Sequence, residues 1–349
     1  MTSDPEAIVS RAGKPNRKAN IFDVARLAGV SHQTVSRVIN DFPSVRPVTR
    51  ERVQQAIAQL RYSPSPAARA LVTKRTRLIG LIAPSTADFG PASIALHFSD
   101  AARDARYGVV SVTSVDASAS SIRPLVESLL DQRVEAIVLI VTDIAVLSAV
   151  HQLDAGVPIV AVAAGARRGT ATTSIDQYRG ARAAVRHLVE LGHRRILHLS
   201  GPSTAPDAIE RLRGWRDELA ASRLVAEEPG HGDWSPVTGY RYGSSLELAD
   251  RPLAVFVAND QMALGVMSAL KSQRFLVPGD VSIVGFDDIP EAAFFDPPLT
   301  TVSQDFAALG ALTMQRVLIA IEEPEGSAES TPIPTKLVIR SSTARPNAK

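Results

Sequence analysis

The sequence predicts an α/β body built on parallel sheets, preceded by a small all-α unit. From Arg77 onward, short apolar runs alternate with helical patterns, which is typical of repeated βα units. Before Arg77 the apolar residues recur at helical spacing instead, and Lys and Arg are concentrated there. A chain of 349 residues is long enough for about two or three such units, and 45% apolar residues allow a large core.

The charged residues are divided unevenly between the two parts. Residues 1–77 contain 14 Lys and Arg against 5 Asp and Glu, whereas the rest of the chain contains 24 against 31. A basic N-terminal part on a mildly acidic body indicates that the N-terminal part meets a polyanion. On charge alone, a basic disordered tail is the alternative.

Several classes of protein are disfavoured by composition. The chain has no cysteine, which excludes disulfides and thiolate metal sites. Its first twenty residues lack the apolar stretch of a signal peptide, and no later apolar run reaches the ~18–20 residues that span a bilayer. We therefore expect a soluble cytoplasmic protein without a membrane partner.

Residues 1–19 are polar and without period, so we expect a disordered basic arm. The apolar residues that follow lie on one face of a helix: Ile21, Val24, Ala25 and Ala28. Gly29 permits the left-handed backbone that ends this helix, and Ser31 is a good N-cap for the next one. A third helix is expected at about 47–60, with Pro47 in its first turn.

The second helix, about residues 31–40, completes a helix-turn-helix unit whose second helix fits the DNA major groove. Opposite its buried face it carries His32, Gln33, Ser36 and Arg37. Gln33 and Arg37 lie four residues apart and project from one side. Glutamine can pair with adenine and arginine with guanine, each contributing ~1–3 kcal/mol of base discrimination. Ser31 and Thr34, near the helix N-terminus, suit phosphate contacts.

The motif DVARLAGVSHQTVSRVIN, residues 23–40, resembles the headpiece signature of the lactose-repressor (LacI/GalR) family. The resemblance is strongest to the namesake of that family, and it includes Gln33 and Arg37 at the principal base-contacting positions. His32 replaces the tyrosine of the namesake, so the preferred half-site is expected to differ. Arg46 stands where the family usually caps the third helix with serine.

The headpiece is expected over residues 20–65. Its Pro-rich end, residues 63–66, leads into a short Ala-rich stretch, and the whole hinge segment, residues 66–77, is too short to be a stable helix alone. The resemblance implies a hinge helix that orders on the operator, with Ala68 and Leu71 contacting DNA and Leu71 wedged into the minor groove. A helix that forms only on DNA is a two-state element that a ligand can bias. A plain linker is the alternative when the resemblance is set aside.

Seven apolar runs of the body are interpreted as buried parallel strands: RLIGLIAP, YGVVSVTSV, VEAIVLIV, VPIVAVAA, RRILHLSG, LAVFVAND and VSIVGFDD. Among the helices between them we expect Ser93–Arg106, Gly180–Leu191 and Glu210–Ala221. Ligands bind such sheets beyond the carboxyl ends of the strands.

Polar residues follow two of these strands, namely Asn259 after LAVFV and Asp287 after VSIVGF. Together with Arg211 and Trp234 they form a suitable set for a sugar, because polar groups bind hydroxyls and the indole packs on a pyranose face. Each also has a structural alternative. Asn or Asp after a strand often caps the next helix, Arg211 could belong to a surface ion pair, and Trp234 could belong to the core.

The resemblance covers residues 20–345, and it implies a periplasmic-binding-protein-like body of two lobes joined by three crossovers. Lobe 1 is expected at about 78–175 plus 304–334, and lobe 2 at about 176–303 plus 335–345. Sugar-contacting positions of the family fall on Arg211, Trp234, Asn259 and Asp287, with Phe306 near the pocket and Asp88 on the rim of lobe 1.

One family position near this pocket differs. Where the namesake of the family has an aspartate, this chain has Ala163, which puts recognition of a β-galactoside in doubt while leaving another glycoside plausible. Our hypothesis is that Asp207 supplies the missing carboxylate.

The expected protein is therefore a sequence-specific transcription regulator, released from a pseudo-palindromic operator by a sugar. We expect a homodimer, because a palindromic site requires two-fold symmetry and the C-terminal segment STARPNAK shows no heptads.

Three other classes of protein are the alternatives to this function. An enzyme is disfavoured because the histidines show no metal-ligand spacing and no nucleophile or phosphate-loop motif occurs; no cofactor or metal is expected. A sugar transport receptor would need a signal peptide and no helix-turn-helix. A regulator with a co-repressor, such as a purine or a phosphoprotein, remains open.

Overall fold

The described part of the N-terminal unit contains three helices: α1 (Ile21–Ala28), α2 (His32–Ile39) and α3 (Pro47–Gln59). Asn20 and Asp23 form a capping box at the start of α1, and Gly29, with φ 63°, ends it in the left-handed conformation. Their apolar faces meet in one core: Val24, Ala25, Ala28, Val35, Val38, Val53 and Ala56. The predicted helix-turn-helix arrangement of three helices is confirmed.

The computed structural model describes residues 19–39, 42–62, 75–86, 88–115, 119–146, 155–165, 171–247, 253–323 and 331–346. The chain divides into two units, Met1–Thr76 and Arg77–Lys349, and each is considered by itself. Ala68 and Leu71, expected in the hinge helix, lie outside the described residues.

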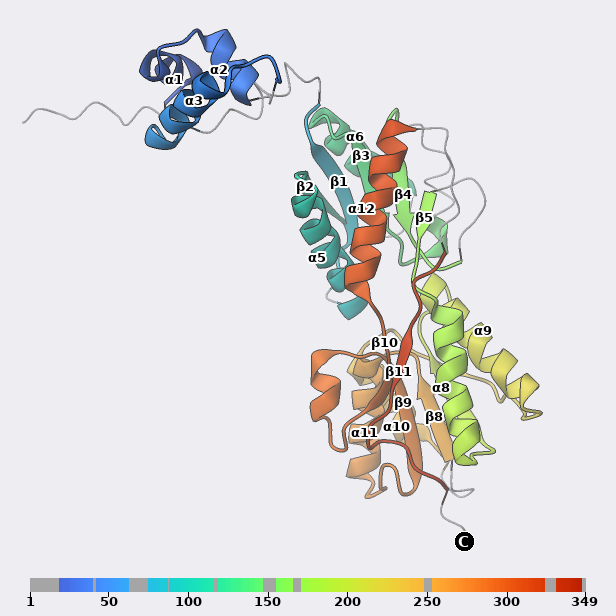
Figure 1. The fold of residues 1–349 in the computed structure, drawn as a ribbon. Helices are drawn as coiled ribbons and strands as arrows, with labels where there is room; N and C mark the ends of the chain where they lie inside the picture. The colour runs from blue at the N-terminus through green and yellow to red at the C-terminus, as the bar shows by residue number, and fades with distance from the viewer. Residues whose placement is uncertain are drawn as a thin grey trace, which may run out of the picture. The chain divides into compact units, whose positions relative to one another are not determined.

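The body contains two sheets (Figure 1). The first has the order β2-β1-β3-β4-β5, and all its pairings are parallel. Its strands are β1 (Leu78–Pro84), β2 (Gly108–Ser114), β3 (Ala136–Ile140), β4 (Ile159–Val162) and β5 (Ala171–Thr173). The second has the order β11-β10-β9-β8-β6-β7, and only β11 on its edge runs antiparallel. Its strands are β6 (Ile196–Ser200), β7 (Gly230–His231), β8 (Leu253–Val257), β9 (Val281–Asp287), β10 (Thr300–Ser303) and β11 (Lys336–Val338).

Each sheet, with the helices on its faces, forms one lobe, and we call them lobe 1 and lobe 2. In lobe 1, α5 (Phe89–Asp104) and α12 (Phe306–Glu322) cover one face of the sheet, and α6 (Ala119–Asp131) covers the other. Figure 1 shows α12 lying along the strands of this sheet. Both faces are therefore shielded from water, which explains why these strands appear in the sequence as uninterrupted apolar runs.

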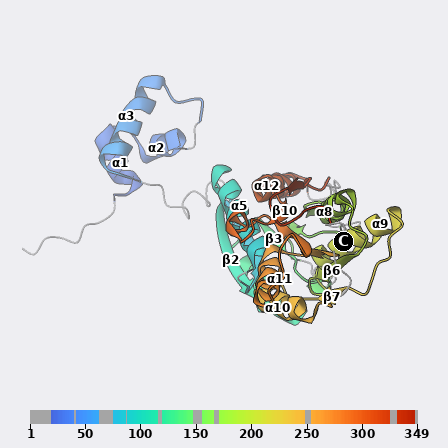
Figure 2. The same ribbon diagram turned by 90° about the horizontal axis from the view of Figure 1, so that it is seen from below.

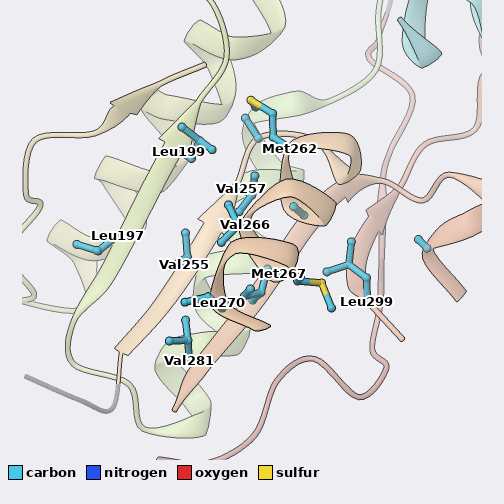
Figure 3. Packing of buried hydrophobic residues seen from close by; sticks show 14 of the residues in the cluster. Leu197, Leu199, Val255, Val257, Met262, Val266, Met267, Leu270, Val281 and Leu299 are labelled. Atoms are coloured by element: carbon cyan, nitrogen blue, oxygen red, sulfur yellow. The ribbon is translucent and has the colours of Figure 1, made fainter. Parts of the chain in front are cut away.

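In lobe 2, α8 (Gln177–Leu191) and α9 (Pro206–Ala221) pack on one face of the sheet. α10 (Pro236–Ser245) and α11 (Asp260–Ser272) lie on the opposite side (Figure 2). Apolar side chains of α11, including Met262, Val266 and Leu270, pack on strand residues such as Val255 and Val257 (Figure 3). The fold class predicted from the sequence, an α/β body of parallel sheets with an all-α N-terminal unit, is confirmed.

Three crossovers join the two lobes, and hydrogen bonds hold them side by side. The backbone N–H of Asp176 donates to the carbonyl of Ile333 at 2.8 Å, and that of Ile333 donates to the carbonyl of Ser174 at 2.9 Å. Gln177 Nε2 donates to Gln304 Oε1 at 2.8 Å. This bond links the remaining crossover, which runs from β10 to α12, to the other two. Any change in the angle between the lobes therefore acts on this small network.

Three helices begin three or four residues earlier than the apolar pattern predicted. α5 begins at Phe89 rather than Ser93, and α9 begins with Pro206, a residue whose fixed φ favours the first helical position. The Asp176 side chain accepts a hydrogen bond from the backbone of Arg179 and so starts α8. In the part of the chain that the structure describes, no helix is long and apolar enough to cross a membrane.

His198, in the centre of β6, is an unusual buried residue. Its ring is 1% exposed and stacks between Trp215, at 5.3 Å, and Phe256, at 4.8 Å between centroids. Its Nδ1 hydrogen-bonds to the carbonyl of Phe256 at 2.8 Å. Burial lowers the pKa of His198 to about 3, so this ring is neutral at any pH above that value.

This burial predicts a pH-dependent loss of stability. Below pH 6.5 His198 is protonated in the unfolded chain but stays neutral in the folded chain. Its contribution to the free energy of unfolding is therefore fully present above pH 6.5 and is lost as the pH falls toward 3. The expected slope is up to ~1.4 kcal/mol of unfolding free energy per pH unit. His198→Leu should flatten this slope in denaturant titrations, whereas His231→Leu, at an exposed position, should not. Equal slopes for wild type and His198→Leu would contradict the prediction.

Candidate ligand cavity and DNA-contacting helix

A cavity that is partly open to solvent is lined by residues of both lobes of the body. The residues that the sequence predicted for ligand binding all line this cavity: Asp88, Asp207, Arg211, Trp234, Asn259, Asp287 and Phe306. The structure thus brings together side chains that are more than 200 residues apart in the sequence.

Arg211, on α9, is 3% exposed and contacts four other groups at this cavity. Its Nε donates to Gln177 Oε1 at 2.9 Å, and its Nη1 donates to the carbonyl of Ala258. Its Nη2 lies 3.3 Å from Asp287 Oδ1, and its guanidinium carbon lies 3.8 Å from the centroid of the Phe286 ring. A buried guanidinium is costly without partners, so these contacts fix both its position and its charge. Arg211 is therefore not half of a surface ion pair.

Asp287 ends β9 and faces the guanidinium of Arg211. It has φ 108°, a backbone conformation that Asp and Asn tolerate better than most residues. Its Oδ1 also accepts a hydrogen bond from Gln304 Nε2 at 2.7 Å. Burial raises the pKa of the Asp287 carboxyl to about 6, against the opposing effect of Arg211. At neutral pH the group is mostly ionised and can accept hydrogen bonds from a ligand.

Asn259 holds Trp234 at the cavity. The Asn259 side chain accepts from the backbone of Met262 at 3.0 Å and so caps α11, while its Nδ2 donates to the carbonyl of Trp234, also at 3.0 Å. Trp234 has φ 71°, and its half-buried indole packs on Gly201, where no Cβ would fit. Strained backbone of this kind is retained where the surroundings impose it, often at ligand sites. Asn259 is thus a helix cap, as the structural interpretation of the sequence predicted, and it lines the cavity as well.

Asp207, in the first turn of α9, has a side chain that is 42% exposed. It lies 4.0 Å from Arg211 Nη2. Ala163 and Ala164, which follow β4 of lobe 1, line the same cavity. Burial raises the pKa of the Asp207 carboxyl, against the opposing effects of Arg211 and of the Ala164 backbone. The two positions of our substitution hypothesis, Ala163 and Asp207, therefore both line the cavity, one from each lobe.

Lobe 1 contributes Asp88 and two aromatic rings. Asp88 occupies the N-cap position of α5, yet its side chain makes no capping hydrogen bond. Phe306, at the start of α12, meets Phe89 edge to face with 5.8 Å between centroids. These rings give the cavity an apolar side opposite the polar residues of lobe 2.

Sequence reasoning missed Gln177 and Gln304, which line the cavity and hydrogen-bond to each other. Gln177 is the first residue of α8, which the sequence analysis expected to begin at Gly180, and Gln304 follows β10, a strand that it did not predict. It also did not assign a role to Asp260, which is fully buried and accepts from Thr301 Oγ1 at 2.6 Å and from the backbone of Ile289 at 2.9 Å. Asp260 binds strand ends together rather than lining the cavity.

In the N-terminal unit, Gln33 and Arg37 are exposed on one side of α2, and His32 is exposed beside them, with its ring 5.1 Å from that of Phe22. Ser31 Oγ accepts from the backbone of Thr34 at 3.2 Å and so caps α2, while Ser36 is half-buried. Among the described residues, no group of three or more His, Asp or Glu is placed to hold a metal ion.

Comparisons with known proteins agree with this architecture. Residues 20–65 match the lacI family of bacterial regulatory proteins, and residues 185–343 match a periplasmic binding protein-like domain. The chain is 34% identical over 338 residues to the lactose operon repressor of Escherichia coli (strain K12), covering 95% of this chain and 93% of that protein. It is 32% identical to the transcriptional repressor PurR of Vibrio atlanticus, covering 88% and 93%.

Solved structures give the same result. The lac repressor dimer bound to operator and the anti-inducer ONPF superposes with a TM-score of 0.83 at 33% identity, covering 94% of this chain and all of that chain. A complex of the transcriptional regulator CelR with cellobiose superposes with a TM-score of 0.69 at 30% identity, covering 93% and 99%.

A helix-turn-helix unit joined to a two-lobed effector-binding body defines a DNA-binding transcription regulator, not an enzyme. The chain belongs to the lacI family of bacterial regulatory proteins. Regulators of this family bind operator DNA as dimers and respond to small-molecule effectors.

The packing of Trp234 on Gly201 yields a direct prediction. In Gly201→Ala the added methyl would lie less than 3.0 Å from the indole, so the ring must move out of its place at the cavity. In a Trp215→Phe background, where Trp234 is the remaining tryptophan, its fluorescence emission should shift to longer wavelength. Gly90→Ala, whose methyl meets nothing within 4 Å, is the control. An unchanged spectrum in Gly201→Ala would show that the indole does not occupy this position.

Proposed function

We propose that this chain is a homodimeric repressor that a neutral sugar or glycoside releases from a pseudo-palindromic operator. The observation that carries the proposal is the charge of the cavity. Among the described residues that line it, Arg211 is the basic one and is already engaged by Asp287, while Asp88 and Asp207 add two more carboxylates. Such a cavity disfavours phosphorylated and other anionic effectors. It suits hydroxyl groups, because a carboxylate is a strong acceptor for the hydrogen bonds that hydroxyls donate.

The combination of polar and aromatic residues in the lining supports the same class of ligand. Sugar rings combine an equator of hydroxyls with apolar faces, and aromatic rings pack on those faces. Trp234, Phe89 and Phe306 supply aromatic surface, while Asn259, Asp287 and Asp207 supply polar atoms. One relative of similar fold was solved with cellobiose, whereas other relatives are named PurR, so relationship alone leaves the effector open.

For DNA recognition we propose that Gln33 and Arg37 contact base edges, with Ser31, His32, Thr34 and Ser36 contacting DNA beside them. The exposure of Gln33 and Arg37 on one side of α2 supports this assignment. Ala68 and Leu71 are proposed to contact the minor groove from the hinge. Two copies related by a two-fold axis would place two α2 helices on two half-sites.

The test of effector class is isothermal titration of the purified protein with neutral glycosides, phosphorylated sugars and purine bases. Operator binding is then measured with and without each ligand that binds. We expect a neutral glycoside to bind and to weaken operator binding. If the best ligand is a purine, or if it strengthens operator binding, the inducer proposal is wrong.

Asp287 provides a matched pair of variants for the effector response. Asp287→Asn suits the positive φ, which alanine does not, and removes the charge that would accept ligand hydroxyls. Loss of a charge-assisted hydrogen bond costs about 1.5–3 kcal/mol, so effector affinity should fall at least tenfold with operator affinity retained. Asp288→Asn is the control, because Asp288 also has positive φ but binds Arg340 at 2.7 Å instead of lining the cavity. Loss of operator binding in Asp287→Asn would indicate a folding role.

Arg37→Ala tests base recognition. If Arg37 pairs with a base, this variant should lose about 1–3 kcal/mol of discrimination at one position in each half-site. Binding to a library of operator variants measures this position by position. Arg26→Ala, at an exposed position of α1, should leave base preference unchanged. Uniform weakening across all sequences would identify Arg37 as a phosphate contact instead.

A further inference from the structure

A second cavity, of about 300 Å³, adjoins the one described above. The two share four lining residues: Asp88, Ile140, Thr142 and Trp234. The second cavity continues from these residues toward the ends of β1 and β2 and toward Pro202 and Thr204 of lobe 2. A ligand that fills the first cavity can therefore extend past Trp234 into the second.

The second cavity is rich in hydroxyl groups: Ser85, Thr86, Ser114, Thr142 and Thr204. Within the described part of the chain, the hydroxyls of Ser85, Thr142 and Thr204 make no side-chain hydrogen bond to the protein. Its described lining contains no Lys or Arg, and its charged members are Asp88 and Asp143. Such a surface offers many donors and acceptors to a neutral ligand and no cation for an anionic one.

The two carboxylates of this cavity differ in the hydrogen bonds that they already make within the protein. Asp143 Oδ1 accepts from the backbone of Ala145 at 2.8 Å, so one of its oxygens is already used locally. Asp88 is half-buried at the junction of the two cavities, at an N-cap position, and its side chain makes no capping bond. A half-buried carboxylate without a protein partner in the described structure has its hydrogen-bonding capacity left for a ligand.

We propose that the second cavity is a subsite for a second sugar unit, so that the effector is a neutral disaccharide or longer glycoside. Its linkage passes Asp88, Thr142 and Trp234, and the unpartnered hydroxyls bind the second ring. This inference rests on the proposed sugar response and specifies the class of sugar. An apolar group attached to a single sugar is the competing occupant, and the hydroxyl-rich lining disfavours it.

Thr204 gives a variant that fills the subsite without touching the first cavity. It is exposed and lines only the second of the two cavities, so Thr204→Trp is expected to fold and to occupy the space of the second ring. Ser203→Trp is the matched control, because Ser203 is the exposed neighbour in the same loop and lines neither cavity. Thermal melting of both variants verifies folding.

The experiment titrates each protein with methyl glucosides and galactosides of both anomeric forms and with cellobiose, maltose, lactose and melibiose. Phenyl glycosides of the same sugars represent the apolar occupant. In wild type and Ser203→Trp, one disaccharide should bind at least tenfold more tightly than its methyl glycoside. In Thr204→Trp that disaccharide should lose at least tenfold in affinity, while the methyl glycoside stays within about twofold.

The outcomes separate the two proposals. If a methyl glycoside binds as tightly as every disaccharide, or if Thr204→Trp weakens both equally, the second subsite is refuted and the sugar response stands. If a phenyl glycoside binds more tightly than every disaccharide, the second cavity holds an apolar group instead of a sugar. If no sugar binds in any form, the sugar response fails and the subsite fails with it.

Discussion

The buried ion pair between Arg211 and Asp287 is the constraint on which the rest of the body depends. Removing a guanidinium and a carboxylate from water is expensive, and the cost is offset only when both are paired and hydrogen-bonded. Here Arg211 also binds Gln177 and the carbonyl of Ala258, and Asp287 also binds Gln304. The pair therefore fixes α9 against the ends of β8 and β9 and against two crossovers at once.

This arrangement gives a physical route from the cavity to the angle between the lobes. Gln177 and Gln304 hydrogen-bond to each other across two crossovers and to the two members of the ion pair. A ligand that hydrogen-bonds to Asp287 competes with Gln304 or adds to it, so it acts directly on the segments about which the lobes turn. A ligand shifts such an equilibrium only by its difference in affinity for the two lobe arrangements. The network places that difference at the crossovers.

Much of this architecture could be predicted from the sequence, because parallel strands covered on both faces appear as apolar runs and ligand sites lie at their carboxyl ends. Asn259 and Asp287 were found by this rule. Gln177 and Gln304 were not, because Gln177 lies in the polar first turn of α8, before its apolar period begins, and Gln304 follows β10, a short strand without a long apolar run. Helix starts were misplaced for a related reason: the first turn of α8 is set by the Asp176 cap and that of α9 by Pro206, and neither signal belongs to the apolar period.

The position of Ala163 concerns both lobes at once. Ala163 and Ala164 of lobe 1 and Asp207 of lobe 2 line the same cavity. A ligand hydroxyl that donates to the Asp207 carboxylate therefore lies beside the end of β4, so a ligand held by Asp207 contacts both lobes. Such a ligand changes the angle between the lobes only by its difference in affinity for the two arrangements, and contact with both lobes is what makes that difference large. Recognition by Asp207 and the spacing of the lobes are therefore coupled through the ligand.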